Sequence, residues 1–366
     1  MKKSIALIFM TMFVFASSMA KTINATFDDT GNLPDGIIVC DDYYEKTQKI
    51  FLKLQDYASS YSKIVEYDTD RLEISKTIFS CEKGFSIRDF NSTKNGFVFS
   101  VTSFGGGEEN HVYFSDIYHY DCLSGELAKI NEKPISESTR GYYPCEPHLN
   151  EKCALYLRHD FESEKSEIVM YDFATKKSDV IAEEKFPENT TGITFLDVDG
   201  EKMLYNSFNQ EKPELHVFDL ATMEKIKTVS GLRTSYVHYN GCLDYEAGTM
   251  VLYAASSRFG DLIYMIDLDS GKSKKLVGFR DYSLIKNDQM YFDGRNIMYT
   301  VQMDVSGYIS DHYYAEIYDT QKLQSSQKPH TAFCFLTKDW KGFLIYDSKA
   351  QTNKIHMQLM KKGASD

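Results

Sequence analysis

Three segments of the sequence place a tyrosine two or three residues after an arginine. The chain has only eight arginines, so three of them in such similar surroundings is more than an even scatter would give. A guanidinium group donates paired hydrogen bonds to a carboxylate or sulfate and stacks on rings. The segments therefore predict a site for an anionic ligand. Its candidate ligand-binding residues are Arg140, Tyr142, Arg233, Tyr236, Arg280 and Tyr282.

The same arginines have a second interpretation, in which each pairs with an acidic residue of a neighbouring structural unit and locks the fold. Networks of ion pairs that stabilise a fold also hold charged side chains in fixed positions and shift their pKa values, as binding sites do. Arg88, Lys328 and His330 occupy comparable places in other parts of the chain. The sequence leaves both interpretations open.

Two histidines point to a different chemistry. His148 and His238 fall on predicted strands that could face a common channel, near Glu146 and Asp244. Imidazole and carboxylate groups together can hold a divalent metal. For two histidines without a fixed spacing, a hydrogen-bonded core position is the commoner explanation. We therefore assign no catalytic residue and no cofactor, with a divalent metal as the alternative.

The sequence lacks the motifs of several other catalytic and binding chemistries. No Gly-x-Ser-x-Gly elbow supports a serine hydrolase, and the Gly105-Gly106-Gly107 run has no Lys-Ser/Thr of a phosphate loop after it. Asp197-x-Asp199-Gly200 has calcium-like spacing without a full ligand set, so we expect a turn. With 41 Lys+Arg, 53 Asp+Glu and a net charge of −12, the chain is not expected to bind nucleic acid.

These residues belong to a repeated unit in which an alternating strand ends in a hydrophobic residue and an aspartate, followed by a polar turn and a second strand. The aspartates recur at intervals of 47 to 53 residues, the period of a four-stranded propeller blade. A carboxylate at a strand end accepts hydrogen bonds from backbone N–H groups of the turn, so a structural role is expected. The six aspartates are Asp68, Asp121, Asp172, Asp219, Asp267 and Asp319.

The repeats predict an all-β fold, a single β-propeller of seven four-stranded blades, with six blades as the alternative. Residues 36–366 are assigned to the propeller and residues 21–35 to an N-terminal segment. Within that segment, residues 21–27 are a candidate for the outer strand of the last blade, because a closed ring leaves no sheet edge open. The polar residues 41–53 either belong to blade one or form a short helix before it.

The first twenty residues have the pattern of a signal peptide. Lys2 and Lys3 precede an apolar run over residues 5–15, and small residues lead to Ala20. The run is too short to cross a bilayer as a mature helix, and no later segment is long and apolar enough to do so. We expect a periplasmic or secreted protein without a transmembrane segment.

The seven cysteines are scattered over the chain rather than arranged as a dense disulfide framework. Cys145 and Cys153 flank a predicted tight turn that could set them opposite each other. A disulfide between them and two buried thiols are both open. No pair of Cys-x-x-Cys spacings points to zinc.

The segment Asp197–Tyr205 resembles the strand-turn-strand signature of bacterial TolB-like (WD40-like) propeller repeats. The Asp-x-x-Ser/Thr-Gly turns are similar to those of many exported bacterial propellers. This resemblance covers nearly the whole chain after residue 20 as a repeat pattern, and it supports the fold more than a function. TolB itself is a poor match, because it carries an extra α/β domain. The single tryptophan, Trp340, disfavours propellers that need one in each repeat.

From these observations we expect an exported, non-catalytic binding or scaffold propeller. It would recognise a protein or an anionic glycan on its channel face. The alternative is a metal-assisted lyase or hydrolase acting on an acidic polysaccharide. The resemblance keeps this alternative open, because TolB-like propellers include oligogalacturonate lyases, which hold a metal with histidines.

Overall fold

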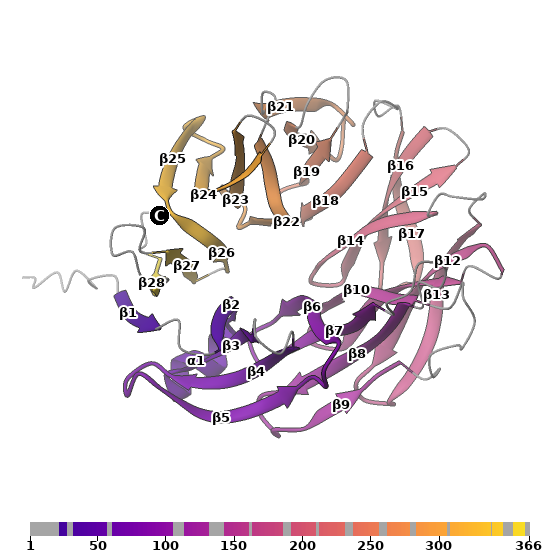
Figure 1. Cartoon of the computed structure of the whole chain (residues 1–366). Helices are drawn as coiled ribbons and strands as arrows, with labels where there is room; N and C mark the ends of the chain where they lie inside the picture. Colours follow the sequence, from indigo (N-terminus) through magenta and orange to yellow (C-terminus); the bar gives the residue numbers. More distant parts are fainter. Residues whose placement is uncertain are drawn as a thin grey trace, which may run out of the picture.

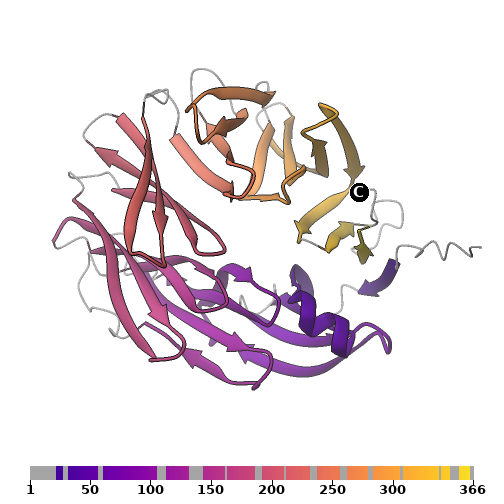
Figure 2. The same ribbon diagram turned by 180° about the vertical axis from the view of Figure 1, so that it is seen from behind.

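A computed structural model of the chain describes residues 22–27, 32–56, 61–104, 113–131, 143–160, 163–185, 192–209, 212–230, 237–255, 262–278, 283–305, 308–337, 339–346 and 354–362. Over these ranges it contains 28 strands and one short helix. The strands form seven antiparallel four-stranded sheets, arranged as the blades of a ring (Figures 1 and 2). The predicted all-β propeller is confirmed, with seven blades rather than six.

In each blade the first strand is innermost and the fourth lies on the outside (Figure 1). Blade one contains β2 (Leu33–Ile38), β3 (Lys49–Asp56), β4 (Tyr61–Asp68) and β5 (Glu73–Ser80). Blade two contains β6 (Phe85–Ser92), β7 (Gly96–Phe104), β8 (Tyr113–Asp121) and β9 (Leu127–Lys129). Blade three contains β10 (Tyr143–Leu149), β11 (Cys153–Asp160), β12 (Lys165–Asp172) and β13 (Lys177–Lys185).

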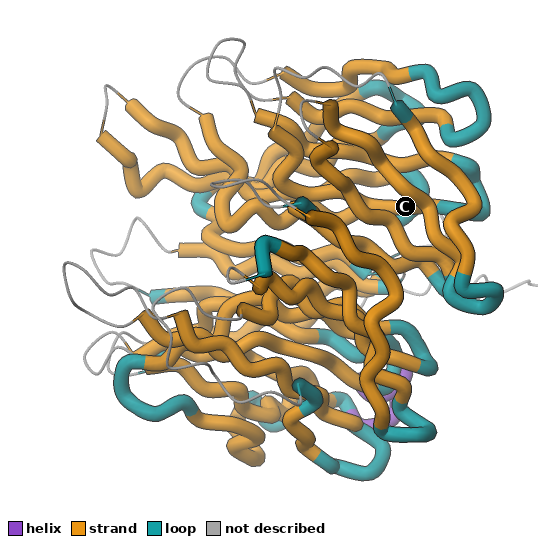
Figure 3. Tube along the Cα trace, turned by 90° about the vertical axis from the view of Figure 1, so that its right-hand side faces the viewer, coloured by secondary structure: helices purple, strands orange, loops and turns teal. Residues whose placement is uncertain are grey.

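The next three blades follow the same order. Blade four contains β14 (Ile193–Asp199), β15 (Lys202–Asn209), β16 (Lys212–Asp219) and β17 (Glu224–Val229). Blade five contains β18 (Val237–Asp244), β19 (Thr249–Ala255), β20 (Leu262–Asp267) and β21 (Ser273–Gly278). Blade six contains β22 (Ser283–Phe292), β23 (Asn296–Val305), β24 (Tyr308–Asp319) and β25 (Gln324–Pro329). In the side view of Figure 3 the strands run through the thickness of the ring.

Blade seven combines the two ends of the chain. Its first three strands are β26 (Thr331–Leu336), β27 (Trp340–Tyr346) and β28 (Ile355–Lys361), and its fourth is β1 (Thr22–Phe27). Thr22 pairs with Met360 in an antiparallel register. Because β1 covers the exposed edge of β28, the last blade is completed by the first strand of the chain.

The single helix, α1 (Asp41–Thr47), lies between β2 and β3. The sequence placed a possible helix before blade one, whereas the structure has it inside that blade. β2 also begins at Leu33, ahead of residue 36.

Among the described residues no helix is long and apolar enough to cross a membrane.

The hydrophobic core lies between the blades. The described residues form seven clusters, and each cluster combines side chains from two adjacent sheets. The middle strands are therefore buried on both faces, as the burial of five consecutive residues of β11 shows. The outermost strands instead expose charged side chains, such as those of β17 and β21, which discourage edge-to-edge pairing.

The repeated aspartates close the turns between the third and fourth strands of blades one to six, as predicted. In blade six, Asp319 Oδ1 accepts hydrogen bonds from the backbone N–H groups of Gln321 at 2.9 Å and Lys322 at 2.8 Å. Four residues after each aspartate the backbone is left-handed, a conformation that favours glycine. These positions are Leu72 (φ 58°), Gly125 (φ 72°), Lys176 (φ 56°), Met223 (φ 59°), Gly271 (φ 66°) and Leu323 (φ 55°).

All seven cysteines are buried and free. In the register between β10 and β11, Cys145 lies opposite Leu157, and Cys153 pairs with Asp172 of the next strand. The turn therefore does not set the two cysteines opposite each other. Of the two alternatives, the structure has the pair of buried thiols.

Candidate functional site

The predicted arginine and tyrosine residues fall in three connections of the same kind. These connections run from β9 to β10, from β17 to β18 and from β21 to β22, so each joins the outermost strand of one blade to the innermost strand of the next. All six candidate residues lie outside the described part of the chain. They are Arg140, Tyr142, Arg233, Tyr236, Arg280 and Tyr282.

The comparable basic residues are described. Arg88 is exposed on β6, and His330 follows β25 with a left-handed backbone (φ 60°). Lys328 Nζ lies 4.0 Å from the centroid of the Phe343 ring and donates a hydrogen bond to Gln358 Oε1, both in blade seven. Lys328 thus joins blades six and seven, through a ring and an amide rather than through an acidic side chain.

The innermost strands are joined by acidic and amide side chains. Asp89 Oδ2 on β6 accepts a hydrogen bond from the Glu146 N–H on β10 at 3.4 Å. Asp197 Oδ2 on β14 accepts one from the Leu243 N–H on β18 at 2.5 Å. Such bonds satisfy backbone donors that no sheet ladder pairs. These carboxylates are therefore committed to contacts between blades.

His148, on the innermost strand of blade three, faces the seam between blades three and four. Its Nδ1 lies 3.8 Å from Asp197 Oδ1, and both side chains are about 20% exposed. Burial lowers the pKa of His148 to about 4. Burial also raises the pKa of Asp197 to about 7, although the Leu243 hydrogen bond acts in the opposite direction. Between these values both side chains are uncharged, so their contact is not an ion pair.

The described part of the chain does not group His148 with the predicted acidic partners into a metal site. A register shift between Cys145 and His148 marks a bulge in β10, and Glu146 within it has a left-handed backbone (φ 49°). Asp244 Oδ1 accepts the Ala247 N–H at 3.0 Å in a turn. The side chain of His238 lies outside the described residues. In the described part of the chain, no three His, Cys, Asp or Glu side chains are grouped to hold a metal.

Two other described histidines, His159 and His216, are core residues. His159 Nδ1 and Ser166 Oγ lie 2.8 Å apart, and His216 Nε2 and Ser207 Oγ lie 2.7 Å apart. Burial lowers the pKa of each imidazole to about 4, so both are neutral at physiological pH. Their hydrogen-bonded positions are those expected of structural histidines.

No known family profile matches the sequence, and no curated protein matches it significantly. An oligogalacturonate lyase in complex with manganese superposes with a TM-score of 0.56 at 9% identity, covering 95% of this chain and 99% of that chain. An oligogalacturonate lyase from Vibrio parahaemolyticus gives 0.51 at 11% identity, covering 93% and 98%. TolB from Acinetobacter baumannii gives 0.42 at 14% identity, covering 85% and 79%. At these identities the likeness establishes the propeller fold and no activity.

Proposed function

We propose that this chain is an exported, non-catalytic binding or scaffold propeller that recognises a protein or an anionic glycan. The observation that supports it is the equivalence of the three Arg-Tyr segments. Each follows the fourth strand of a blade and precedes the first strand of the next. Connections of this kind leave the ring at the same face, so three guanidinium groups would meet there on a chain with a net charge of −12. That combination suits a carboxylate or sulfate ligand.

A binding assay with immobilised polysaccharides tests this proposal. Heparin and polygalacturonate carry anionic groups, and dextran is the neutral control. We expect the protein to bind an anionic polymer and the triple variant Arg140→Gln, Arg233→Gln, Arg280→Gln to lose that binding. Arg71→Gln is the matched control, because its side chain is 75% exposed in a turn at the opposite end of the strands. Equal losses in both variants would contradict a specific anionic face.

A metal-assisted lyase is the second candidate, and one observation favours it. His148 is a neutral imidazole on an innermost strand, which is the form that ligates a metal. The hydrogen bonds that Asp89 and Asp197 accept count against it, since these inner-strand carboxylates already hold neighbouring blades together. Metal analysis of the purified protein separates the two functions. Stoichiometric manganese, calcium or zinc that is lost in His148→Ala, together with unsaturated products from polygalacturonate, would support the lyase.

A further inference from the structure

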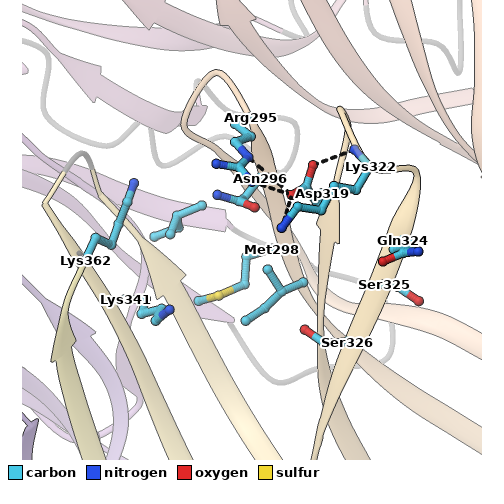
Figure 4. A pocket seen from close by; sticks show the side chains of 12 residues that line it. Arg295, Asn296, Met298, Asp319, Lys322, Gln324, Ser325, Ser326, Lys341 and Lys362 are labelled. Atoms are coloured by element: carbon cyan, nitrogen blue, oxygen red, sulfur yellow. Dashed lines mark hydrogen bonds and ion pairs between the residues drawn. The ribbon is translucent and has the colours of Figure 1, made fainter. Parts of the chain in front are cut away.

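The seams between blades differ in the side chains that close them. Between blades six and seven, a cavity of about 290 Å³ is lined by charged and polar groups that include Arg295, Asp319 and Lys341 (Figure 4). The seam between blades one and two is instead filled by an apolar cluster that includes two thiols. Cys40 and Cys122 are 1% and 7% exposed and belong to this cluster. They lie at the end of the strands opposite the Arg-Tyr segments.

Cys40 follows β2 of blade one, yet hydrogen bonds tie its surroundings to blade two. The Ser92 hydroxyl donates to the carbonyl of the residue before Cys40 at 3.0 Å. The Tyr43 N–H donates to the Lys94 C=O at 3.1 Å. Between these two anchors, Cys40 Sγ donates a hydrogen bond to the Gly96 C=O at 3.3 Å. The thiol of Cys40 is therefore fixed against the beginning of β7.

Cys122 reaches the same place from the third strand of blade two. It follows Asp121, the repeated aspartate at the end of β8, and its backbone N–H donates to the Asn95 C=O at 2.9 Å. Asn95 and Gly96 are consecutive residues. The two cysteines are thus bonded to adjacent peptide groups of one strand, which keeps them close together although they come from different blades.

The ionisation of the buried groups agrees with this placement. Burial raises the pKa of Cys40 well above its usual range, and the Cys122 thiol raises it further through a hydrogen bond and through charge. Burial raises the pKa of Tyr120 to about 12, and both Cys122 and Cys40 add to this shift. A third cysteine of the cluster, Cys81, has a different neighbour, because its Sγ lies 3.8 Å from Ser62 Oγ.

We propose that Cys40 and Cys122 form a disulfide that joins blade one to blade two, and that the structure shows the reduced form of this pair. The oxidant is an external disulfide, such as oxidised glutathione or a dithiol–disulfide oxidoreductase. The thiolate of Cys122, the more exposed of the two, attacks one sulfur of that disulfide and displaces the other as a thiolate. The Cys40 thiolate then attacks Cys122 Sγ and displaces the second thiolate. The external disulfide gains two electrons, and its two thiolates take up the two protons that the cysteines lose.

The disulfide would fix the part of blade one that also contacts blade seven. Helix α1 begins directly after Cys40, and its Tyr44 ring packs edge-on against Trp340 at 4.6 Å between centroids. Joining Cys40 to blade two therefore anchors a helix that helps to close the ring. Export would bring the chain to a compartment where such oxidants are present. The pairing itself does not depend on the proposed function, because the oxidant is supplied in the test.

Peptide mapping of the native protein tests the pairing. The reduced, purified chain is incubated with an excess of oxidised glutathione, alkylated and digested with trypsin without a reducing agent. Trypsin places Cys40, Cys81 and Cys122 on separate peptides, residues 22–46, 77–83 and 95–129. We expect peptides 22–46 and 95–129 to be linked, with the mass of two hydrogen atoms missing from their sum. Two of the seven free thiols should be lost, and the melting temperature should rise because the cross-link restricts the unfolded chain.

Serine variants show which thiols react. Cys40→Ser and Cys122→Ser should each abolish the linked peptide and the rise in melting temperature. Cys81→Ser is the matched control, since it removes a buried thiol from the same cluster and should leave both effects unchanged. Three outcomes would overturn the proposal: no linked peptide, a link from either cysteine to a different one, or glutathione that stays attached to Cys122. If a serine variant fails to fold, the map of the unaltered protein still decides.

Discussion

Asp197 and His148 meet across the seam between blades four and three, with 3.8 Å between Oδ1 and Nδ1. A carboxylate and an imidazolium at this distance would attract each other, yet burial shifts the two pKa values to about 7 for Asp197 and about 4 for His148, so that both side chains are neutral between about pH 4 and pH 7. In that range the pair is held by burial, and by the hydrogen bond that Asp197 accepts from Leu243, rather than by charge. Ionisation of the Asp197 carboxyl should therefore change the free energy of unfolding.

The variant Asp197→Asn should be more stable than the original protein at pH 8. The folded pKa of about 7 exceeds the unfolded value of about 3.9, so the folded state binds an extra proton between these values. The original protein therefore loses stability relative to the variant as pH rises from about 4 to about 7, with no further loss above that. An asparagine can still accept the Leu243 N–H. Chemical denaturation at pH 5 and pH 8 measures the difference, and a pH-independent difference would contradict it.

Thermal melts distinguish the two roles of the Arg-Tyr segments. If the arginines face a ligand from exposed connections, Arg140→Gln, Arg233→Gln and Arg280→Gln should each change stability by less than about 0.5 kcal/mol. If they lock neighbouring blades, each change would leave a partly buried carboxylate unpaired and cost about 3 kcal/mol. We expect the smaller effect. Large losses in all three variants would rule out the proposed binding face.

The left-handed position after each repeated aspartate predicts opposite effects for two substitutions. Met223 adopts φ 59° and is 44% exposed, so Met223→Gly should raise stability by roughly 0.5 kcal/mol, because the relief of backbone strain exceeds the packing that is lost. Gly271 adopts φ 66°, and Gly271→Ala should lower stability by about 1 kcal/mol. Urea unfolding of both variants measures these changes. A loss of stability in Met223→Gly would argue against strain at this position.

The seam between blades seven and one depends on β1, and the single tryptophan can report on it. Trp340 is 1% exposed, and its ring meets Tyr44 of α1 edge-on at 4.6 Å between centroids. Ile23 of β1 is buried in the same cluster. We expect Ile23→Ala to cost about 3 kcal/mol and to lower the temperature at which Trp340 fluorescence changes.

The neighbouring residue of β1 provides the control for that experiment. Asn24 is exposed on the opposite face of the strand, so Asn24→Ala should change stability by less than about 0.5 kcal/mol. Equal effects of the two substitutions would mean that β1 does not stabilise the ring through its buried face.

Export can be tested by mass spectrometry of the protein made in a bacterial host. The small residues before Ala20 predict that cleavage follows Ala20, so the mature chain should begin at Lys21. Purification from the periplasm or the medium with that mass supports the proposal. A full-length chain confined to the cytoplasm would contradict it.

The fold could be predicted because its signal is repeated. Each blade has the same strand-turn-strand pattern, and each aspartate such as Asp267 makes local hydrogen bonds that depend on nearby residues alone. Helix α1 was harder to place, since one short polar segment has no repeat to compare with. Cys145 and Cys153 show a similar limit, because register rather than spacing decides which side chains meet.

Sites between blades could not be predicted in the same way. His148 approaches Asp197 across a seam, and Arg295 and Lys341 line one cavity although they belong to different blades. Nothing in the local sequence of one blade indicates which side chain the next blade brings opposite. Predicting such contacts requires the number of blades, the register within each sheet and the packing angle between sheets.

The pairing of β1 with β28 also limits when the last blade can be completed. Thr26 Oγ1 and His356 Nδ1 lie 2.9 Å apart although 330 positions separate them in the chain. Local hairpins of the other blades can form while the C-terminal residues are still being synthesised, whereas this contact must wait for the last strand. Until then β28 has no outer neighbour. During this interval the open edge of β28 is available to another strand, so the interval is when the chain is most exposed to edge-to-edge aggregation.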